Sequence, residues 1–142
     1  MKVCLIDVFE SIAGSKKEIW QYDNDTIGIS ANADLIVFNG HNGLMDYNLD
    51  YYTSVDNQIR DVSVIGCVSH SYFKDHLLRA KGYPVLMTTN LMAPEAYVAE
   101  ALIDAWVNLK PEHEIRTSAG AAYHQYQQCG LNGATNLFKV GW

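Results

Sequence analysis

Two short apolar stretches decide the fold: residues 34–43, DLIVFNGHNG, and residues 61–67, DVSVIGC. Both are rich in β-branched residues and are bounded by Gly, Asn or Asp, which is typical of buried strands in a parallel sheet. The first stretch contains His41 at its end, and the second ends at Cys67. Functional groups of open α/β sheets gather just beyond the carboxyl ends of the strands. If the two strands are neighbours, a base and a thiol emerge side by side, as nucleophilic cysteine catalysis requires.

The composition indicates one globular domain over residues 1–142. Of these residues 49% are hydrophobic and 18% are charged, and the net charge is −6,. Without a cluster of Lys and Arg, nucleic acid is not expected as a partner. No apolar run approaches the ~20 residues of a membrane helix. Three widely spaced cysteines, Cys4, Cys67 and Cys129, form neither a disulfide framework nor a C-x-x-C metal site,. The simplest interpretation is a reducing, cytoplasmic compartment.

The remaining chain alternates between expected strands and expected helices. Further strands are expected at residues 2–8, 26–29 and 84–90, the second of them at a sheet edge,. Helices are expected at residues 54–60, 69–80, 94–109, 112–128 and 132–138,. This alternation implies βαβ units and right-handed crossovers. We therefore expect an α/β fold, a three-layer α/β/α sandwich around a mostly parallel sheet.

Cys67 is the candidate nucleophile. Gly66 allows the backbone to turn sharply before it, and a helix is expected to begin near Ser69. Unpaired amides at a helix N-terminus stabilise a thiolate, and so does a nearby histidine. The alternative is a buried cysteine at a strand end. Cys4, within the strand expected at residues 2–8, is interpreted as a small core residue. The backbone amides of Gly43 and Cys67 are expected to form an oxyanion hole.

His41 is the candidate general base. Glycines at 40 and 43 and asparagines at 39 and 42 surround it, a bare setting that a substrate can approach. His70 is an alternative base, and Asp46 and Asp50 are alternative partners of His41 as metal ligands. Their spacing matches no specific metal motif, so we expect no metal and no cofactor.

Polar residues at the end of the strand expected at 84–90 are candidates for contact with a substrate: Thr88, Thr89 and Asn90. β-Propensity and helix capping explain the same residues equally well. Three other histidines are expected on the surface: His76, His113 and His124. The sequence lacks the signatures of serine hydrolases, P-loop proteins, Rossmann cofactor sites and zinc peptidases.

The chain has one apolar strand followed by Gly-His-x-Gly (Gly40–Gly43) and a second apolar strand followed by Gly-Cys (66–67). This pattern resembles the caspase-like cysteine peptidases, among them caspases, legumain, gingipain, clostripain and separase. The resemblance covers roughly residues 34–90. It implies a caspase-like domain in which His41 and Cys67 form a dyad. Three longer motifs resemble a bacterial family with no assigned activity: HNGLMD at 41–46, TTNLMAPEAY at 88–97 and YHQYQQCG at 123–130.

Two departures from that pattern carry expectations of their own. Asn42 separates His41 from the glycine that follows histidine directly in the superfamily. The stretch before His41 is also short, which predicts that the first strand and helix of such a domain are missing. A sheet edge is then exposed, and a second copy of the chain or a partner chain would cover it.

The sequence thus supports two main functions. The first is a cysteine peptidase or amide hydrolase that acts on a peptide or protein through an acyl-enzyme. The second is a non-catalytic caspase-like module for binding or assembly. A third, a metal-assisted hydrolase built on His41 with Asp46 or Asp50, stays open as well.

Overall fold

The computed structural model describes residues 2–142, and a four-stranded sheet with the order β3-β4-β5-β6 forms its centre. The strands β3 (Leu35–Asn39), β4 (Arg60–Ile65) and β5 (Gly82–Thr88) are parallel, and the short β6 (Phe138–Lys139) is antiparallel to β5. Asn39 lies opposite Ile65 in the register of β3 and β4. The two strands expected to be neighbours are therefore neighbours, and the α/β class and the mostly parallel sheet are confirmed.

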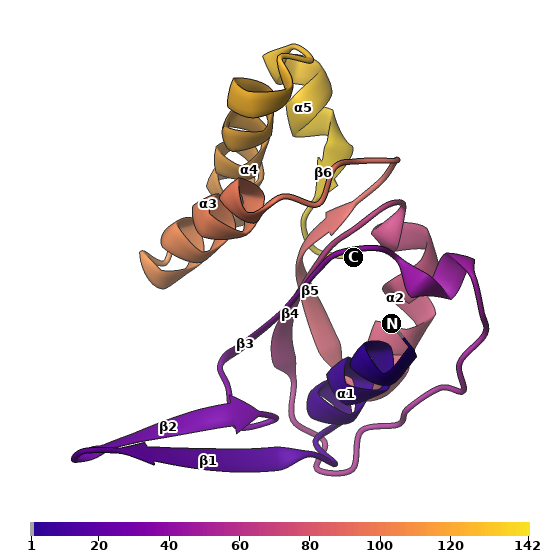
Figure 1. Cartoon of the computed structure of the whole chain (residues 1–142), viewed down its shortest axis with the longest axis vertical. Coiled ribbons are helices and arrows are strands. Elements are labelled where there is room, and N and C mark those ends of the chain that lie inside the picture. Colours follow the sequence, from indigo (N-terminus) through magenta and orange to yellow (C-terminus); the bar gives the residue numbers. More distant parts are fainter. Residues whose placement is uncertain (1) are drawn as a thin grey trace.

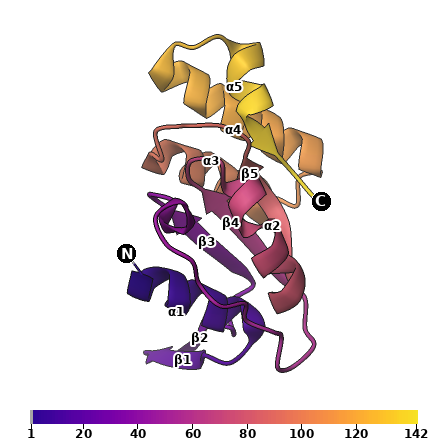
Figure 2. The same ribbon diagram turned by 90° about the vertical axis from the view of Figure 1, so that its right-hand side faces the viewer.

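Helices cover both faces of this sheet (Figure 1). On one face α1 (Lys2–Ala13) and α2 (Ser69–Ala80) pack around a core that includes Phe73. On the other face α3 (Ala96–Val107) and α4 (Glu112–Gln127) pack around a second core that includes Leu102. A short 3₁₀ helix, η1 (Gly43–Met45), follows β3, and α5 (Leu131–Leu137) leads into β6 (Figure 2). The helices expected at residues 69–80, 112–128 and 132–138 are confirmed within a residue.

The expected strand at residues 2–8 is wrong, because this segment forms the first part of α1. Leu5, Phe9 and Ile12 are completely buried, and their spacing places them on one helical face against the sheet,. Residues 2–8 resemble a strand when they are considered alone. The helical spacing becomes visible only when Phe9 and Ile12 are included. Cys4 lies on the outer face of α1 and is exposed, so its expected place in the core is also wrong.

A separate two-stranded antiparallel sheet, formed by β1 (Lys17–Tyr22) and β2 (Asp25–Ser30), projects from the base of the domain (Figures 1 and 2). The edge strand expected at 26–29 lies within β2. Trp20 pairs with Ile27 across the hairpin, and both side chains stay about half exposed, at 54% and 44%. Unlike the central sheet, the hairpin has no buried face of its own.

Arg60, the first residue of β4, holds together the segments at the amino end of the central sheet. Its side chain is only 5% exposed and donates hydrogen bonds to the carbonyls of Ile12 and Ala31 and to the carboxylate of Asp56. The two helical turns expected at residues 54–60 do not form. Instead the side chains of Ser54 and Asp56 accept hydrogen bonds from the amides of Asn57 and Gln58. A local side-chain interaction has replaced the helical ladder here.

The helix expected to begin at Pro94 begins two residues later, at Ala96, and ends at Val107. Residues 89–95 therefore form a loop that crosses the carboxyl end of the sheet after β5. Within residues 2–142, no helix has both the length and the apolar composition needed to cross a membrane.

Candidate functional site

The backbones that follow β3 and β4 touch directly. The amide of Gly40 donates to the carbonyl of Ile65 at 3.0 Å, which extends the ladder past the end of β3. A Cβ atom on Gly66 would lie 2.6 Å from the carbonyl oxygen of Gly40, closer than side chains tolerate. Only glycine fits at position 66, and this close approach brings the segment with His41 beside the segment with Cys67.

Asn42 joins these two segments through its side chain. It is completely buried, and its Nδ2 donates to the carbonyl of Cys67 at 2.7 Å. Its Oδ1 accepts a hydrogen bond of 3.1 Å from the amide of Leu44 and so caps η1. The residue that separates His41 from Gly43 in the sequence is thus a clamp between the two candidate segments. Its position between a histidine and a glycine at a strand end is the signal that sequence reasoning left unused.

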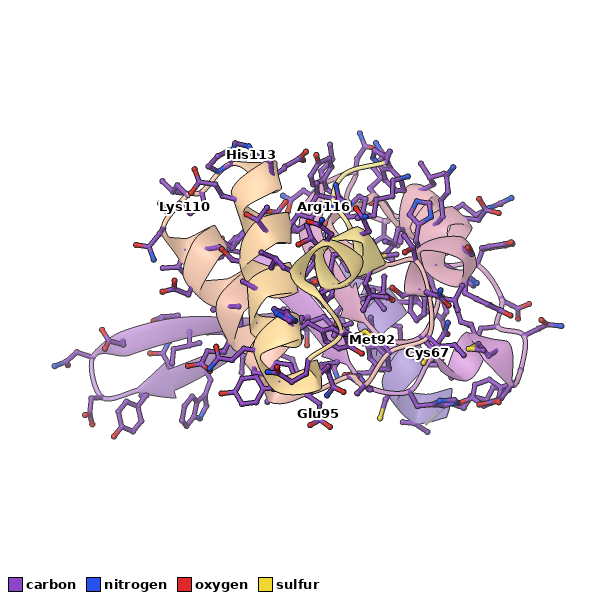
Figure 3. The ribbon with its side chains drawn as sticks, turned by 90° about the horizontal axis from the view of Figure 1, so that it is seen from above. Cys67, Met92, Glu95, Lys110, His113 and Arg116 are labelled. Carbon is purple, nitrogen blue, oxygen red and sulfur yellow. The ribbon has the colours of Figure 1, made fainter. Side chains whose placement is uncertain are left out.

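Cys67 lies in the turn between β4 and α2, and its side chain is half-buried. The thiol donates to the carbonyl of Met92 at 3.4 Å and accepts from the amide of Met92 at 3.5 Å, and the two residues lie together in Figure 3. The loop 89–95 therefore holds the thiol in this conformation. As expected, a helix begins just after Cys67. The first amides of that segment are already used, since Val68 N donates to Asn90 O and Ser69 N to Gly66 O.

Val68, directly after Cys67, has a left-handed backbone with φ of 51° and ψ of 32°. A β-branched side chain rarely adopts this conformation, which costs on the order of 1–3 kcal/mol. Strain of this kind concentrates at functional sites. The turn that presents the thiol is therefore maintained against its local preference by the contacts around it.

A buried pair of hydroxyl groups provides much of that support. Ser69 Oγ donates to the carbonyl of Val64 at 2.7 Å and accepts from the amide of Thr88 at 2.9 Å. The hydroxyl of Thr88 donates to the carbonyl of Gly66. Both residues are completely buried. Ser69 was expected only near a helix start, whereas it connects the Cys67 turn to β5.

The candidate base is held by a carboxylate. His41 Nε2 lies 2.6 Å from Asp46 Oδ2, and both side chains are about half exposed. The contact orients the imidazole ring and leaves Nδ1 as its second nitrogen. Within residues 2–142 no hydrogen bond links His41 to Cys67, so the structure places the two on adjoining segments without joining them. Nor does this part of the chain contain three His, Cys, Asp or Glu side chains placed together to hold a metal ion.

The amides expected to form an oxyanion hole belong to Gly43 and Cys67, on the two segments that Asn42 connects. In the described chain neither amide donates a hydrogen bond to a carbonyl or a side chain. Gly43 itself is buried as the first residue of η1. The two amides are thus without a competing partner in residues 2–142.

The three candidate substrate contacts have different surroundings. Thr88 is buried and its hydroxyl is engaged with Gly66, so it is not available to a substrate in this conformation. The hydroxyl of Thr89 donates to the carbonyl of Leu137 at 3.1 Å. Asn90 is exposed, and its Oδ1 accepts from the amide of Leu91 at 2.8 Å. Asn90 is therefore the one of the three whose side chain lies on the surface without a bond to another element.

None of the other histidines forms a hydrogen bond with Cys67 within residues 2–142. Nε2 of His70 accepts from Lys139 Nζ at 2.9 Å, and burial together with that lysine lowers the pKa of the imidazole. His113 is exposed as expected (Figure 3) and His124 is half-buried. The expectation for His76 is wrong, because it is only 7% exposed and packs between aromatic rings.

Comparison of the chain with protein-family models, with curated proteins and with solved structures yields no match.

Proposed function

We propose that this chain is a cysteine-dependent amide hydrolase of the caspase-like peptidase type, with Cys67 as nucleophile and His41 as general base. One observation carries the proposal: the hydrogen bond of 2.7 Å from buried Asn42 to the carbonyl of Cys67, which ties together the two segments that bear these residues. A structural cysteine at a strand end has no need of such a clamp. The caspase-like sandwich and the peptide or protein substrate belong to the same proposal.

In the proposed reaction His41 takes the proton of the Cys67 thiol, and the thiolate attacks the carbonyl carbon of the scissile amide. Negative charge develops on the carbonyl oxygen, where the amides of Gly43 and Cys67 stabilise it; one such donor is typically worth about 3 kcal/mol. His41 then gives the proton to the leaving amine as the C–N bond breaks. Water, activated by His41, hydrolyses the acyl-enzyme and restores the thiol. No cofactor takes part.

Two further residues have roles in this mechanism. Asp46, which by sequence is an alternative metal ligand, contacts Nε2 of His41 and so orients the imidazole ring. The other ring nitrogen, Nδ1, then acts as the base. The backbone of Met92 holds the thiol at rest, and attack on a substrate breaks these contacts. All three cysteines are free thiols, which fits a reducing, cytoplasmic setting,.

The test is the rate at which iodoacetamide labels each cysteine. Cys4 and Cys129 are both exposed and serve as internal references, whereas Cys67 is half-buried. At pH 7 we expect Cys67 to react faster than either reference, and His41→Ala to slow it by about 10- to 30-fold, because an unassisted thiol is only a few per cent thiolate at that pH. His113→Ala, which removes an exposed histidine on α4, is the matched control and should change nothing.

A Cys67 that reacts more slowly than both references and is indifferent to His41→Ala contradicts the proposal. If the rates behave as expected, a peptide library then identifies the substrate, and Cys67→Ala must abolish any cleavage found.

A second candidate, a module for binding or assembly without catalysis, is favoured by the projecting hairpin. Trp20, Tyr22, Ile27 and Ile29 lie on one face of it and are between 39% and 57% exposed. In addition, β3 forms an edge of the described sheet. Sedimentation of the wild type and of Trp20→Ser distinguishes the candidates, since assembly through this face predicts a wild-type oligomer that the variant loses.

A further inference from the structure

A groove of about 490 Å³ lies beside β3, the strand at the edge of the central sheet. Leu35 and Val37 of β3 line it, together with residues of β2 and of α3. In Figures 1 and 2 β3 likewise lies between α3 and the hairpin. The volume is within the range of binding sites, about 300–1,000 Å³. Neither His41 nor Cys67 lines the groove, so it is separate from the candidate hydrolytic site.

The outer edge of β3 has backbone groups without partners. Along a strand, successive residues direct their N–H and C=O groups to opposite sides. The amide of Gly40 donates to the carbonyl of Ile65, so the even-numbered residues of β3 are the ones bonded to β4. The backbone groups of the odd-numbered residues therefore face outward: Leu35, Val37 and Asn39. Within residues 2–142 no hydrogen bond joins these groups to another segment.

An edge of this kind is a template for a further strand. When an extended peptide adds to a sheet, backbone hydrogen bonds supply the affinity and alternate side chains supply the specificity. We expect the added strand to be antiparallel, because antiparallel pairs are roughly two- to three-fold commoner than parallel ones. Every second side chain of that strand then lies on the same face as Leu35 and Val37, which is the face of the groove,.

The side chains around the groove are apolar and partly exposed. Ile27 of β2 is 44% exposed and Ile103 of α3 is 43% exposed. The indole of Trp106 is half-buried and is held by a hydrogen bond of 2.7 Å to Asp61 of β4. Aliphatic side chains of an added strand would be buried against these three residues, which favours binding. The groove therefore fits a peptide with apolar residues at alternate positions.

The segments that form the groove are acidic. Residues 25–39 and α3 contain no lysine, arginine or histidine, and they contain four carboxylates: Asp25, Asp34, Glu100 and Asp104. Asp34 is exposed and lines the groove itself. Like charges opposed across an interface disfavour association. A second copy of the chain would bring the same four carboxylates to this edge, whereas a basic partner segment is complementary to them.

We propose that the outer edge of β3 binds an extended segment of a partner protein, with apolar side chains at alternate positions and a lysine or arginine at its carboxyl end. When the central apolar residue of an antiparallel segment lies opposite Val37, the residue three positions later lies opposite Asp34. The cation then pairs with the Asp34 carboxylate, and the apolar side chains lie against Ile27 and Ile103. Binding at this edge does not depend on catalysis at Cys67. It also differs from assembly through the hairpin, because it leaves the chain without a second copy.

The probe is the peptide KVTVTVK, acetylated at its amino end and amidated at its carboxyl end, which is titrated into the ¹⁵N-labelled full chain. The amide signals of Leu35, Val37 and Asn39 should shift saturably, because each amide gains a hydrogen-bond acceptor. N-methylation of the central valine removes an N–H directed at β3 and should weaken binding by about tenfold or more. N-methylation of the threonine that follows removes an N–H directed at solvent. This second peptide is the matched control and should bind as the parent peptide does.

Single substitutions test the charge and the apolar wall. Asp34→Asn should weaken binding by about two- to fivefold, and so should glutamate in place of the carboxyl-terminal lysine of the peptide. Asp23→Asn is the control, because Asp23 is an exposed carboxylate of the hairpin turn that does not line the groove. Ile103→Ser should weaken binding by about three- to tenfold. Leu78→Ser, at a side chain 50% exposed on the opposite face of the sheet, should not. All four side chains are exposed, so these variants do not endanger the fold.

Four results overturn the proposal. Equal binding of the two N-methylated peptides would show that the backbone of β3 does not pair with the peptide. Equal binding of the lysine and glutamate peptides would show that charge plays no part. A response that does not saturate by about 1 mM would show that no built site is present. The fourth is a wild-type dimer in sedimentation whose Leu35 and Val37 amides resist hydrogen exchange before any peptide is added, since a second copy then covers the edge.

Discussion

The two ends of the parallel sheet are held together by different chemistry. At the amino end a charged group, the guanidinium of Arg60, is buried and connects the end of α1, the segment after β2 and the loop that contains Asp56. At the carboxyl end the connections are neutral: the amide of Asn42 and the hydroxyls of Ser69 and Thr88. Both sets are buried, and both join segments that are distant in the sequence.

This difference has a consequence for the candidate site. A buried ion pair makes stability depend on pH and places a strong field nearby. Neutral hydrogen bonds fix the backbone around Cys67 and His41 without adding charge. At the carboxyl end the ionisable side chains of the candidate site, His41 and Cys67, therefore have no buried ion pair beside them. The buried ion pair of Arg60 and Asp56 lies at the opposite end of the strands.

Of the differences between the two ends of the sheet, the largest is expected at the amino end. Arg60→Met removes the donors to two carbonyls in a buried setting, and we expect the free energy of unfolding to fall by about 3 kcal/mol in a urea titration. Lys110→Met is the matched control, since Lys110 forms an exposed pair with Glu114 at the same i,i+4 spacing as Asp56 and Arg60. Exposed pairs contribute about 0–1 kcal/mol. Equal losses in the two variants would contradict the role given to Arg60.

The next effect is at the carboxyl end. Gly66→Ala places a Cβ atom 2.6 Å from the carbonyl oxygen of Gly40, and the two segments must separate. We expect a loss of about 2 kcal/mol, typical of overpacking, together with a change in the alkylation rate of Cys67. Gly133→Ala in α5 is the control, because no atom lies within 4 Å of its added Cβ. It should stabilise the helix by about 0.5–1 kcal/mol. A Gly66→Ala protein as stable as the wild type would show that the segments are not in contact.

A smaller effect is expected from acid. The hydrogen bonds from Arg60, and then those from Lys17 and from the amide of Gln58, hold the pKa of Asp56 far below its usual range. The stability that Asp56 contributes is therefore complete above the unfolded pKa of about 3.9 and is lost as the pH falls below it. Urea titrations between about pH 6 and pH 3 should show a steeper decline in the wild type than in Arg60→Met. Parallel curves would assign the acid sensitivity to other carboxylates.

The smallest effect is expected in the hairpin, which belongs to neither end of the sheet. Trp20→Ser changes an exposed side chain, and the monomer should change in stability by no more than about 0.5 kcal/mol,. Phe73→Ala in the core below α2 should cost about 3–5 kcal/mol in the same assay,. A large loss in Trp20→Ser would mean that its face is covered in solution.

The sequence predicts the parts of the fold whose pattern is complete within one element. The strands after residues 34 and 60 are continuous apolar runs, and the helices α2, α4 and α5 show a helical period with clear ends. By contrast, residues 2–8 taken alone predict a strand, because the buried face of α1 extends beyond them to Phe9 and Ile12. The hairpin offers no burial pattern to detect, since its apolar residues face outward.

The candidate site follows the same division. That His41 and Cys67 lie on adjoining segments was predictable, because each closely follows an apolar strand and the two strands pair. Asn42, Ser69 and Met92 were not, because their contacts join segments 19–25 residues apart. The burial of His76 was missed for a similar reason: the rings around it come from α1 and from the loop after η1.

The hairpin also has a consequence for protein engineering. Its strands leave and re-enter the domain side by side, with the amide of Ala31 donating to the carbonyl of Lys16 at 2.9 Å. A short turn spans such a gap, so residues 17–30 are a cassette that is exchangeable without redirecting the chain on either side. Reporter peptides or affinity tags inserted there would project from the base of the domain, as the hairpin does, and the parent domain would serve as their scaffold.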